Sequence, residues 1–122
     1  MRKQILIADD HTGIRRLVKY VLSETLDISD YQEAANGRET IERAEQTRPD
    51  LIILDIAMPE MDGITAAKHL KKSMPGIPII LFTMYDLGQG SADSLGVDAV
   101  VSKPDGFTKL AEEVNTLLLR KC

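Results

Sequence analysis

Acidic, hydroxyl and basic side chains follow four of the apolar runs in this sequence. Asp9 and Asp10 follow the first run, and Asp55 comes directly after the run "LIIL". Thr83 ends a third run, and Lys103 comes shortly after a fourth. An ionised carboxylate at the edge of an apolar core is costly unless it is hydrogen-bonded, paired or bound to a metal. These five side chains are therefore candidates for chemistry.

Three carboxylates close together need a cation. At an effective dielectric constant near 20, two carboxylates a few ångströms apart repel by about 4 kcal/mol. Carboxylate oxygens without a set of His or Cys ligands suit Mg²⁺, which binds a few protein oxygens together with water and a substrate phosphate. Lys103 supplies a point charge for a phosphate oxygen, and the Thr83 hydroxyl can donate to another. Asp55 has no basic neighbour in sequence, so we predict that it is the nucleophile that attacks phosphorus and forms an acyl phosphate.

Strand-like and helix-like patterns alternate along the chain. Amphipathic stripes with apolar residues three and four positions apart begin at Ile14 and Phe107. Less sharply patterned helices are predicted over 38–47 and 64–73, each followed by a proline. Apolar runs typical of strands occupy 5–8, 51–54, 77–83 and 99–101, with a weaker one near 28–35. The order is therefore strand and helix, repeated five times.

This order predicts a doubly wound α/β fold. Three of the runs are almost continuously apolar, as expected of parallel strands that are covered by helices on both faces. We predict a five-stranded parallel sheet with five helices, flavodoxin-like, in one domain over 1–122. In such sheets ligands bind beyond the carboxyl ends of the strands, where the strand order reverses. The five candidate side chains all belong to that rim.

The composition narrows the expected partners and compartment. A net charge of −4 provides no excess of Lys and Arg for binding phosphates, so we expect no direct nucleic-acid binding by this chain. The apolar runs are too short to cross a bilayer, and the first residues lack the features of a signal peptide. We therefore expect no membrane association and a cytoplasmic location. The single cysteine, Cys122, cannot form an internal disulfide and is expected to be a spectator thiol.

Four motifs are similar to those of a known family. "ILIADDH", "IILDIAMPEMDG", "IILFT" and "VVSKP" stand in the order and spacing of the receiver (CheY-like) domains of bacterial two-component response regulators. The similarity covers essentially the whole chain. "DDHTGIRR" and "FTMYD" further resemble the branch whose full-length members carry a LuxR-type helix-turn-helix output domain.

The resemblance implies Mg²⁺-dependent phosphotransfer from a sensor histidine kinase to Asp55. Thr83 and Lys103 would sense the phosphate and switch the surface over 84–104, which would control an output domain or a partner protein. No enzymatic activity is implied beyond the domain's own phosphorylation and dephosphorylation, and a phosphorylation-dependent dimer is left open. The implied metal ligands are Asp10, Asp55, the backbone carbonyl of Ala57 and, through water, Asp9.

Several positions depart from the family pattern. Val100 stands where many receivers carry Tyr or Phe, whose ring rotates inward on phosphorylation, so the aromatic half of the usual switch is missing. Met84 stands where a small residue is common and could narrow the approach of the phosphodonor. Gly88 and Gly90 lie where a helix should begin, and each costs about 1 kcal/mol relative to Ala inside a helix. We therefore predict a short, frayed or displaced helix, and an order–disorder switch of residues 84–96.

Further expectations concern single residues near these motifs. A cis peptide between Lys103 and Pro104 is expected by resemblance, and because a cis X-Pro bond could aim the lysine at the site. Gly63 is expected to supply backbone freedom in the turn before the following helix. His11 is expected to be an exposed residue at the start of a helix, and His69 a residue on a helix surface.

Three other functions fit parts of the pattern. A haloacid-dehalogenase-like phosphatase would need a second Asp two residues after the nucleophile, where this chain has Ala57. A flavodoxin-like cofactor binder would have a first loop rich in Ser, Thr and Gly, whereas "DDHTG" would repel a phosphate. A degenerate receiver used only for interaction is supported by Val100 and the glycines. The retained acidic, hydroxyl and lysine side chains argue against it.

Overall fold

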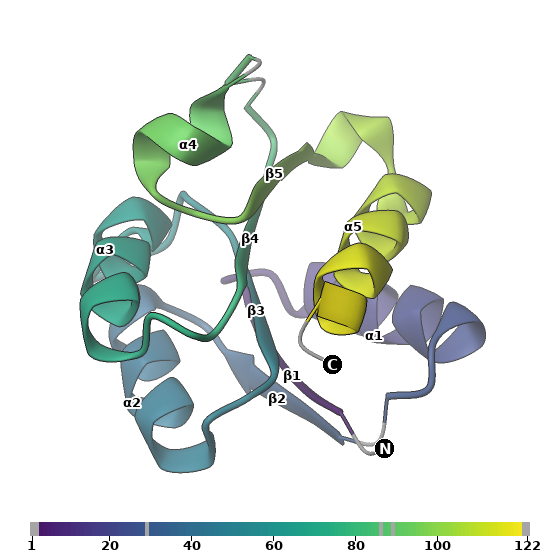
Figure 1. Ribbon diagram of the computed structural model, residues 1–122, viewed down its shortest axis with the longest axis horizontal. Helices are drawn as coiled ribbons and strands as arrows, with labels where there is room; N and C mark the ends of the chain where they lie inside the picture. Colours follow the sequence, from purple (N-terminus) through teal and green to yellow (C-terminus); the bar gives the residue numbers. More distant parts are fainter. Residues whose placement is uncertain (1–2, 29, 86, 89, 121–122) are drawn as a thin grey trace.

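Strands and helices alternate along the whole chain, as the sequence predicts (Figure 1). The structure is a computed structural model that describes residues 3–28, 30–85, 87–88 and 90–120; Cys122 lies outside these ranges. The elements are β1 (Gln4–Ala8), α1 (Thr12–Thr25), β2 (Asp30–Ala34), α2 (Gly37–Thr47), β3 (Leu51–Leu54), α3 (Gly63–Ser73), β4 (Ile79–Thr83), α4 (Ser91–Leu95), β5 (Ala99–Ser102), a 3₁₀ turn η1 (Lys103–Asp105) and α5 (Phe107–Arg120).

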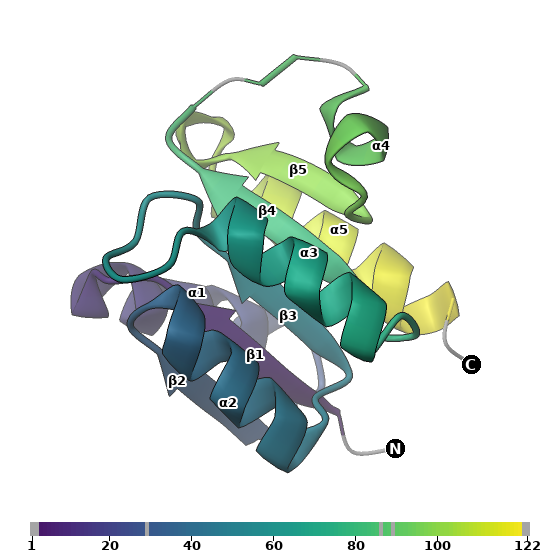
Figure 2. The same cartoon turned by 90° about the vertical axis from the view of Figure 1, so that its left-hand side faces the viewer.

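One parallel sheet forms the middle layer of the molecule. Its strand order is β2-β1-β3-β4-β5, and every neighbouring pair is parallel. Helices α1 and α5 cover one face, and α2, α3 and α4 lie on the other (Figures 1 and 2). The predicted doubly wound α/β fold with a five-stranded parallel sheet is therefore confirmed.

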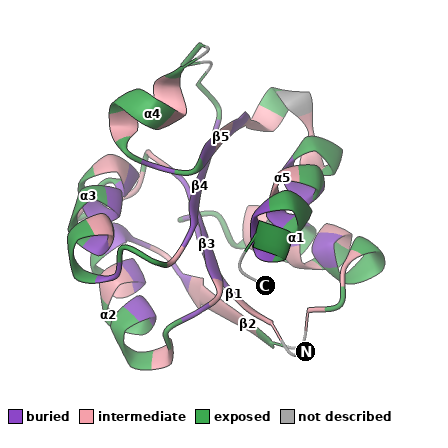
Figure 3. Ribbon diagram, viewed as in Figure 1, coloured by how far each residue is buried: buried purple, intermediate pink, exposed green. Residues whose placement is uncertain are grey.

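The central strands are apolar throughout because each contributes to two cores. In β1, Ile5 and Ile7 pack with α1 and α5, whereas Leu6 and Ala8 pack with α2 and α3. Successive side chains of a strand point to opposite faces, so a strand that is covered on both sides has no polar position. Figure 3 shows the resulting buried layer between the two helical layers.

Element bounds differ from the predictions where local chemistry overrides the pattern. β4 begins at Ile79 rather than at residue 77, and Pro78, which has no N–H to donate to a strand ladder, stands between them. α4 has only five residues, none of them buried. Gly88 and Gly90 precede it with φ of 79° and 82°, so the short helix that these glycines predict is confirmed. Among the residues that the structure describes, no helix is long and apolar enough to span a membrane.

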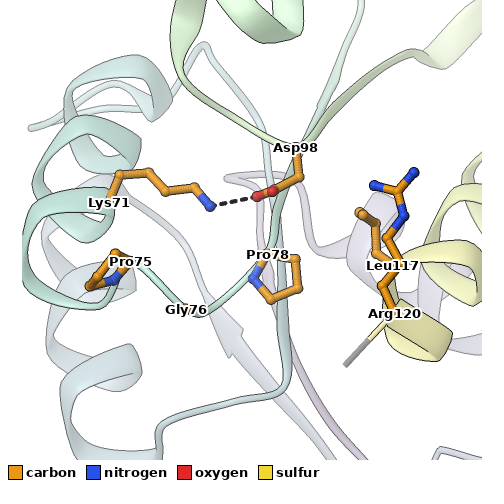
Figure 4. A pocket seen from close by; sticks show the side chains of 7 residues that line it. All are labelled: Lys71, Pro75, Gly76, Pro78, Asp98, Leu117 and Arg120. Carbon is orange, nitrogen blue, oxygen red and sulfur yellow. Dashed lines mark hydrogen bonds and ion pairs between the residues drawn. The ribbon is translucent and has the colours of Figure 1, made fainter. Parts of the chain in front are cut away.

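At the amino ends of β4 and β5, Asp98 joins three elements (Figure 4). Its Oδ2 accepts from Lys71 Nζ at 2.6 Å and from the backbone N–H of Ile79 at 2.7 Å. The Lys71 ammonium also donates to the Ile77 carbonyl at 3.2 Å. The cluster borders a small cavity of about 160 Å³ at the end of the sheet away from the candidate residues. It fixes the start of β4 against α3 and β5.

We expect Asp98→Ala to lower the free energy of unfolding by about 1 to 2 kcal/mol, because the buried Ile79 N–H loses its acceptor. Asp98→Asn, which keeps one acceptor oxygen, should lose less. Urea unfolding measures the effect, with Asp27→Ala, which removes an exposed carboxylate, as the matched control. Equal stabilities of Asp98→Ala and the control would show that the cluster contributes nothing.

Candidate functional site

The candidate acids meet where the strand order reverses. β1 has β2 on one side and β3 on the other, so the loops after β1 and β3 leave the sheet toward opposite faces. Ala8 pairs with Leu54, which places Asp9 and Asp55 side by side just beyond the last pair. The backbone N–H of Asp55 donates to the Ala8 carbonyl at 2.9 Å. Parallel register thus sets the distance between the two carboxylates.

Lys103 places its ammonium between these two buried acids. Lys103 Nζ lies 2.7 Å from Asp9 Oδ2 and 3.4 Å from Asp55 Oδ2, and only 9% of its side chain is exposed. The ammonium also lies 5.9 Å from the centroid of the Phe82 ring, a cation–π arrangement that suits a desolvated charge. The predicted convergence of lysine and aspartates at the rim is present, but the lysine is nearer to Asp9 than to Asp55.

The backbone that delivers Lys103 differs from the prediction. The peptide bond between Lys103 and Pro104 is trans, so the predicted cis bond is wrong. Thr83 pairs with Ser102 in the sheet, and the η1 turn begins with the next residue. A proline near the start of a helical turn needs no N–H there, so the turn can present the lysine with an ordinary trans bond.

Asp55 is a carboxylate in a poorly solvated position. It is 5% exposed, and its Oδ1 accepts from the backbone N–H of Ile56 at 2.8 Å. Burial raises the pKa of Asp55, the nearby charge of Asp9 raises that pKa further, and Lys103 opposes both. Additional positive charge at this rim would favour the ionised form of Asp55, which is the form that can act as a nucleophile.

Gly63 lets α3 pack directly on the backbone of Asp55. A Cβ atom at position 63 would lie 1.9 Å from the Asp55 carbonyl oxygen, and the Gly63 N–H donates to the Ile56 carbonyl at 2.8 Å. Gly63 is not among the residues with positive φ. The predicted role in backbone freedom is therefore wrong, because this position requires the absence of a side chain and not an unusual φ.

His11 is an exposed residue at the start of α1, as predicted, and it also belongs to the acidic cluster. Its Nδ1 lies 3.1 Å from Asp9 Oδ1 and 3.0 Å from Asp10 Oδ1. Together with Asp55 these residues offer one ligand atom each within 4.8 Å of one another. Three carboxylates and one Lys103 ammonium leave a net charge of −2, so the donor set fits a divalent cation.

Arg15, which the sequence pattern does not single out, supports the loop that carries the acids. Its guanidinium donates to the backbone carbonyl of Asp9, and Nε donates to Glu33 Oε1 at 2.8 Å. Glu33 also accepts from Lys19 at 2.9 Å. Hydrogen bonds from Lys19 and then Arg15 lower the pKa of Glu33. The spacing His11 to Arg15 is one helical turn, which places both side chains near this rim.

The remaining candidate residues lie around the acidic cluster. Thr83 is fully buried, and its hydroxyl accepts from the Tyr85 N–H at 3.3 Å. Met84 is exposed beside it, and Ala57 is exposed in the loop after β3. Val100 is half-buried and packs with the core under α2 and α3. The sheet therefore brings Thr83 to the same rim as the acids, whereas metal binding by the Ala57 carbonyl stays a prediction.

Comparisons with known proteins agree with this geometry. Residues 5–115 match the response regulator receiver domain. The chain is 37% identical over 116 residues to a protein-glutamate methylesterase/protein-glutamine glutaminase from Alkalilimnicola ehrlichii, covering 93% of this chain and 30% of that protein. It is 34% identical over 113 residues to the response regulator protein VraR from Staphylococcus saprophyticus, covering 91% of this chain and 54% of that protein.

A solved structure of the response regulator protein TrrA from Thermotoga maritima, in complex with Mg²⁺-BeF, superimposes with a TM-score of 0.83. It is 34% identical and covers 94% of this chain and 98% of that chain. The chain thus matches TrrA along nearly its full length. By contrast, it spans only about a third and a half of the methylesterase and VraR relatives, respectively.

We expect Gly63→Ala to displace Asp55 and to destabilise the domain by about 1 to 3 kcal/mol, as overpacking in a closely packed region does. Gly76→Ala is the matched control, because a Cβ there would meet no described atom within 4 Å. Urea unfolding gives the stabilities, and the amide resonance of Ile56 reports the displacement. A Gly63→Ala domain with unchanged stability and an unchanged Ile56 resonance would contradict the close packing.

Proposed function

The chain belongs to the response regulator receiver domain family, and from this we propose that it accepts a phosphoryl group at Asp55 in a two-component signalling system. The observation that carries the proposal is the pairing of two buried aspartates with one lysine, whose side chain is 9% exposed, at the switch point of the sheet. The match to the TrrA complex with Mg²⁺-BeF supports it.

In the proposed reaction an Asp55 carboxylate oxygen attacks the phosphorus of a phosphohistidine on a sensor histidine kinase. The new P–O bond forms as the P–N bond breaks, and the bonding electron pair returns to the kinase imidazole. Lys103 stabilises negative charge on the transferring oxygens, and Thr83 donates a hydrogen bond to one of them. Hydrolysis of the acyl phosphate by water then releases inorganic phosphate and regenerates the Asp55 carboxylate.

Mg²⁺ fits the acidic side of this site. Asp10, Asp55 and the Ala57 carbonyl would bind it directly, and Asp9 would act through water, since both Asp9 oxygens already accept hydrogen bonds. When bound, Mg²⁺ would neutralise charge on the phosphoryl group. The described part of the chain supplies the oxygen donors and the net negative charge that this ion requires.

The proposed role extends to partners. The chain would act as one receiver domain over 1–122 in the cytoplasm, receive phosphate from a histidine kinase, and control an output domain or partner protein through the 84–104 surface. Its only chemistry would be its own phosphorylation and dephosphorylation. The relatives of which it spans only a part, a methylesterase and VraR, illustrate the kinds of protein in which such a domain occurs.

We expect incubation with a small acyl-phosphate donor and Mg²⁺ to add one phosphate, measured as a shift in intact mass. Omission of Mg²⁺ should prevent it. Asp55→Asn should abolish the shift, because the amide is not a nucleophile, and Asp10→Ala should slow it, because an oxygen ligand is lost. Asp27→Asn, which changes an exposed acid that does not belong to the candidate site, is the control. A full shift in Asp55→Asn would move the acceptor to another residue.

The proposed switch is expected to act on residues 84–96, of which 86 and 89 lie outside the described ranges. No residue from 91 to 95 is buried, so little packing free energy holds this segment, and a contact from Thr83 to phosphate can order it. Amide hydrogen exchange with and without beryllofluoride and Mg²⁺ should show increased protection over 84–96. Thr83→Ala should remove that difference. Equal protection in both states of the unaltered domain would exclude an order–disorder switch.

A further inference from the structure

The His11 side chain belongs to the acidic cluster, and phosphotransfer at Asp55 gives it no role. Its side chain is 68% exposed, so burial does not account for the position of the imidazole at the cluster. The backbone N–H of His11 donates to Asp9 Oδ1 at 2.9 Å, which fixes the residue directly above the carboxylate. The imidazole then lies within reach of both neighbouring acids.

The His11 ring nitrogen and one Asp10 oxygen are spaced like two ligands of one ion. His11 Nδ1 lies 3.1 Å from Asp9 Oδ1 and 3.0 Å from Asp10 Oδ1. Two ligands at right angles around an ion, each about 2.1 Å from it, are about 3.0 Å apart. The 3.1 Å distance from His11 Nδ1 to Asp9 Oδ1 is a hydrogen-bond distance, in keeping with Asp9 acting on the ion through water.

Asp9 divides the charged groups of the site into two sides. Its Oδ2 faces Lys103 at 2.7 Å, and its Oδ1 faces His11. The ammonium therefore neutralises the side toward Asp55, whereas the side toward Asp10 carries carboxylate oxygens and a ring nitrogen. A cation bound on that side would meet a mixed oxygen and nitrogen ligand set.

We propose that His11 Nδ1 is a metal ligand, and that it adds affinity for divalent transition-metal ions, probed with Mn²⁺, that it does not add for Mg²⁺. The inference rests on the proposed function, because it assigns the metal of the same site. Carboxylate and water ligands suit Mg²⁺, whereas an imidazole nitrogen adds affinity for transition-metal ions. Mg²⁺ would keep a water molecule in place of the ring and would gain little from it.

Titration calorimetry with Mn²⁺ and with Mg²⁺ tests this on the whole chain. His11→Ala should raise the Mn²⁺ dissociation constant about tenfold or more, comparable to the loss of a conserved partner of a metal site, and should leave that of Mg²⁺ nearly unchanged. His69→Ala is the matched control, because His69 is the other histidine of the chain and lies on α3 beside Glu45. Mn²⁺ is preferred to Zn²⁺ as the probe, since the thiol of Cys122 is a soft ligand that favours Zn²⁺.

Pulsed electron paramagnetic resonance of the Mn²⁺-bound domain supplies a second readout. A coupling to an imidazole nitrogen should appear in the unaltered chain and in His69→Ala, and should be lost in His11→Ala. Absence of that coupling in the unaltered chain, or an equal loss of affinity for both ions in His11→Ala, would overturn the assignment and leave His11 as a hydrogen-bond donor to the acids.

The outcome is distinguishable from failure of the proposed function. If Asp55 accepts phosphate with Mg²⁺ while no nitrogen coupling is seen, only the role of His11 is wrong. If neither ion binds and Asp55 accepts no phosphate, both the proposed function and the His11 assignment are wrong.

Discussion

The position of the Lys103 ammonium between Asp9 and Asp55 is the interaction on which the rim of the sheet depends. Two carboxylates this poorly solvated repel each other, and removing the cation would leave both uncompensated. The lysine can reach them only because Thr83 pairs with Ser102 and η1 follows at once. Strand register across β1, β3, β4 and β5 is therefore coupled to the electrostatics of the site.

The fold was largely predictable because helices cover both faces of the sheet. Strands β1 and β3 are buried on each side, so their continuous apolar runs give their positions almost to the residue. β2 lies at the edge of the sheet with half-exposed residues, and its weak pattern gave only an approximate range. The start of β4 depended on Pro78, whose effect is on hydrogen bonding and not on hydrophobicity.

The site was predictable as a set of residue types but not as a set of contacts. Because the carboxyl ends of parallel strands meet at one rim, the sequence predicts that the acids, Thr83 and Lys103 lie there. It does not predict which carboxylate oxygen faces which group. The preference of Lys103 for Asp9 and the approach of His11 come from side-chain geometry. The role of Gly63 depends on its contact with Asp55, eight residues earlier in the sequence. The turn sequence alone therefore predicted backbone freedom instead of close packing.

The packing of Gly63 against Asp55 also separates two properties of the domain. The backbone of Asp55, the proposed phosphate acceptor, packs against the first residue of α3. α3 itself is buried against the sheet through Ala66, Ala67 and Leu70. α4 contacts the same core through the partly buried Ala92 and Leu95, and none of its residues is fully buried. Under the proposed function, substitutions on exposed positions of α4 would therefore alter the partner surface without touching the packing between Gly63 and Asp55. The partner contacts and the backbone packing of the acceptor would thus be carried by separate helices.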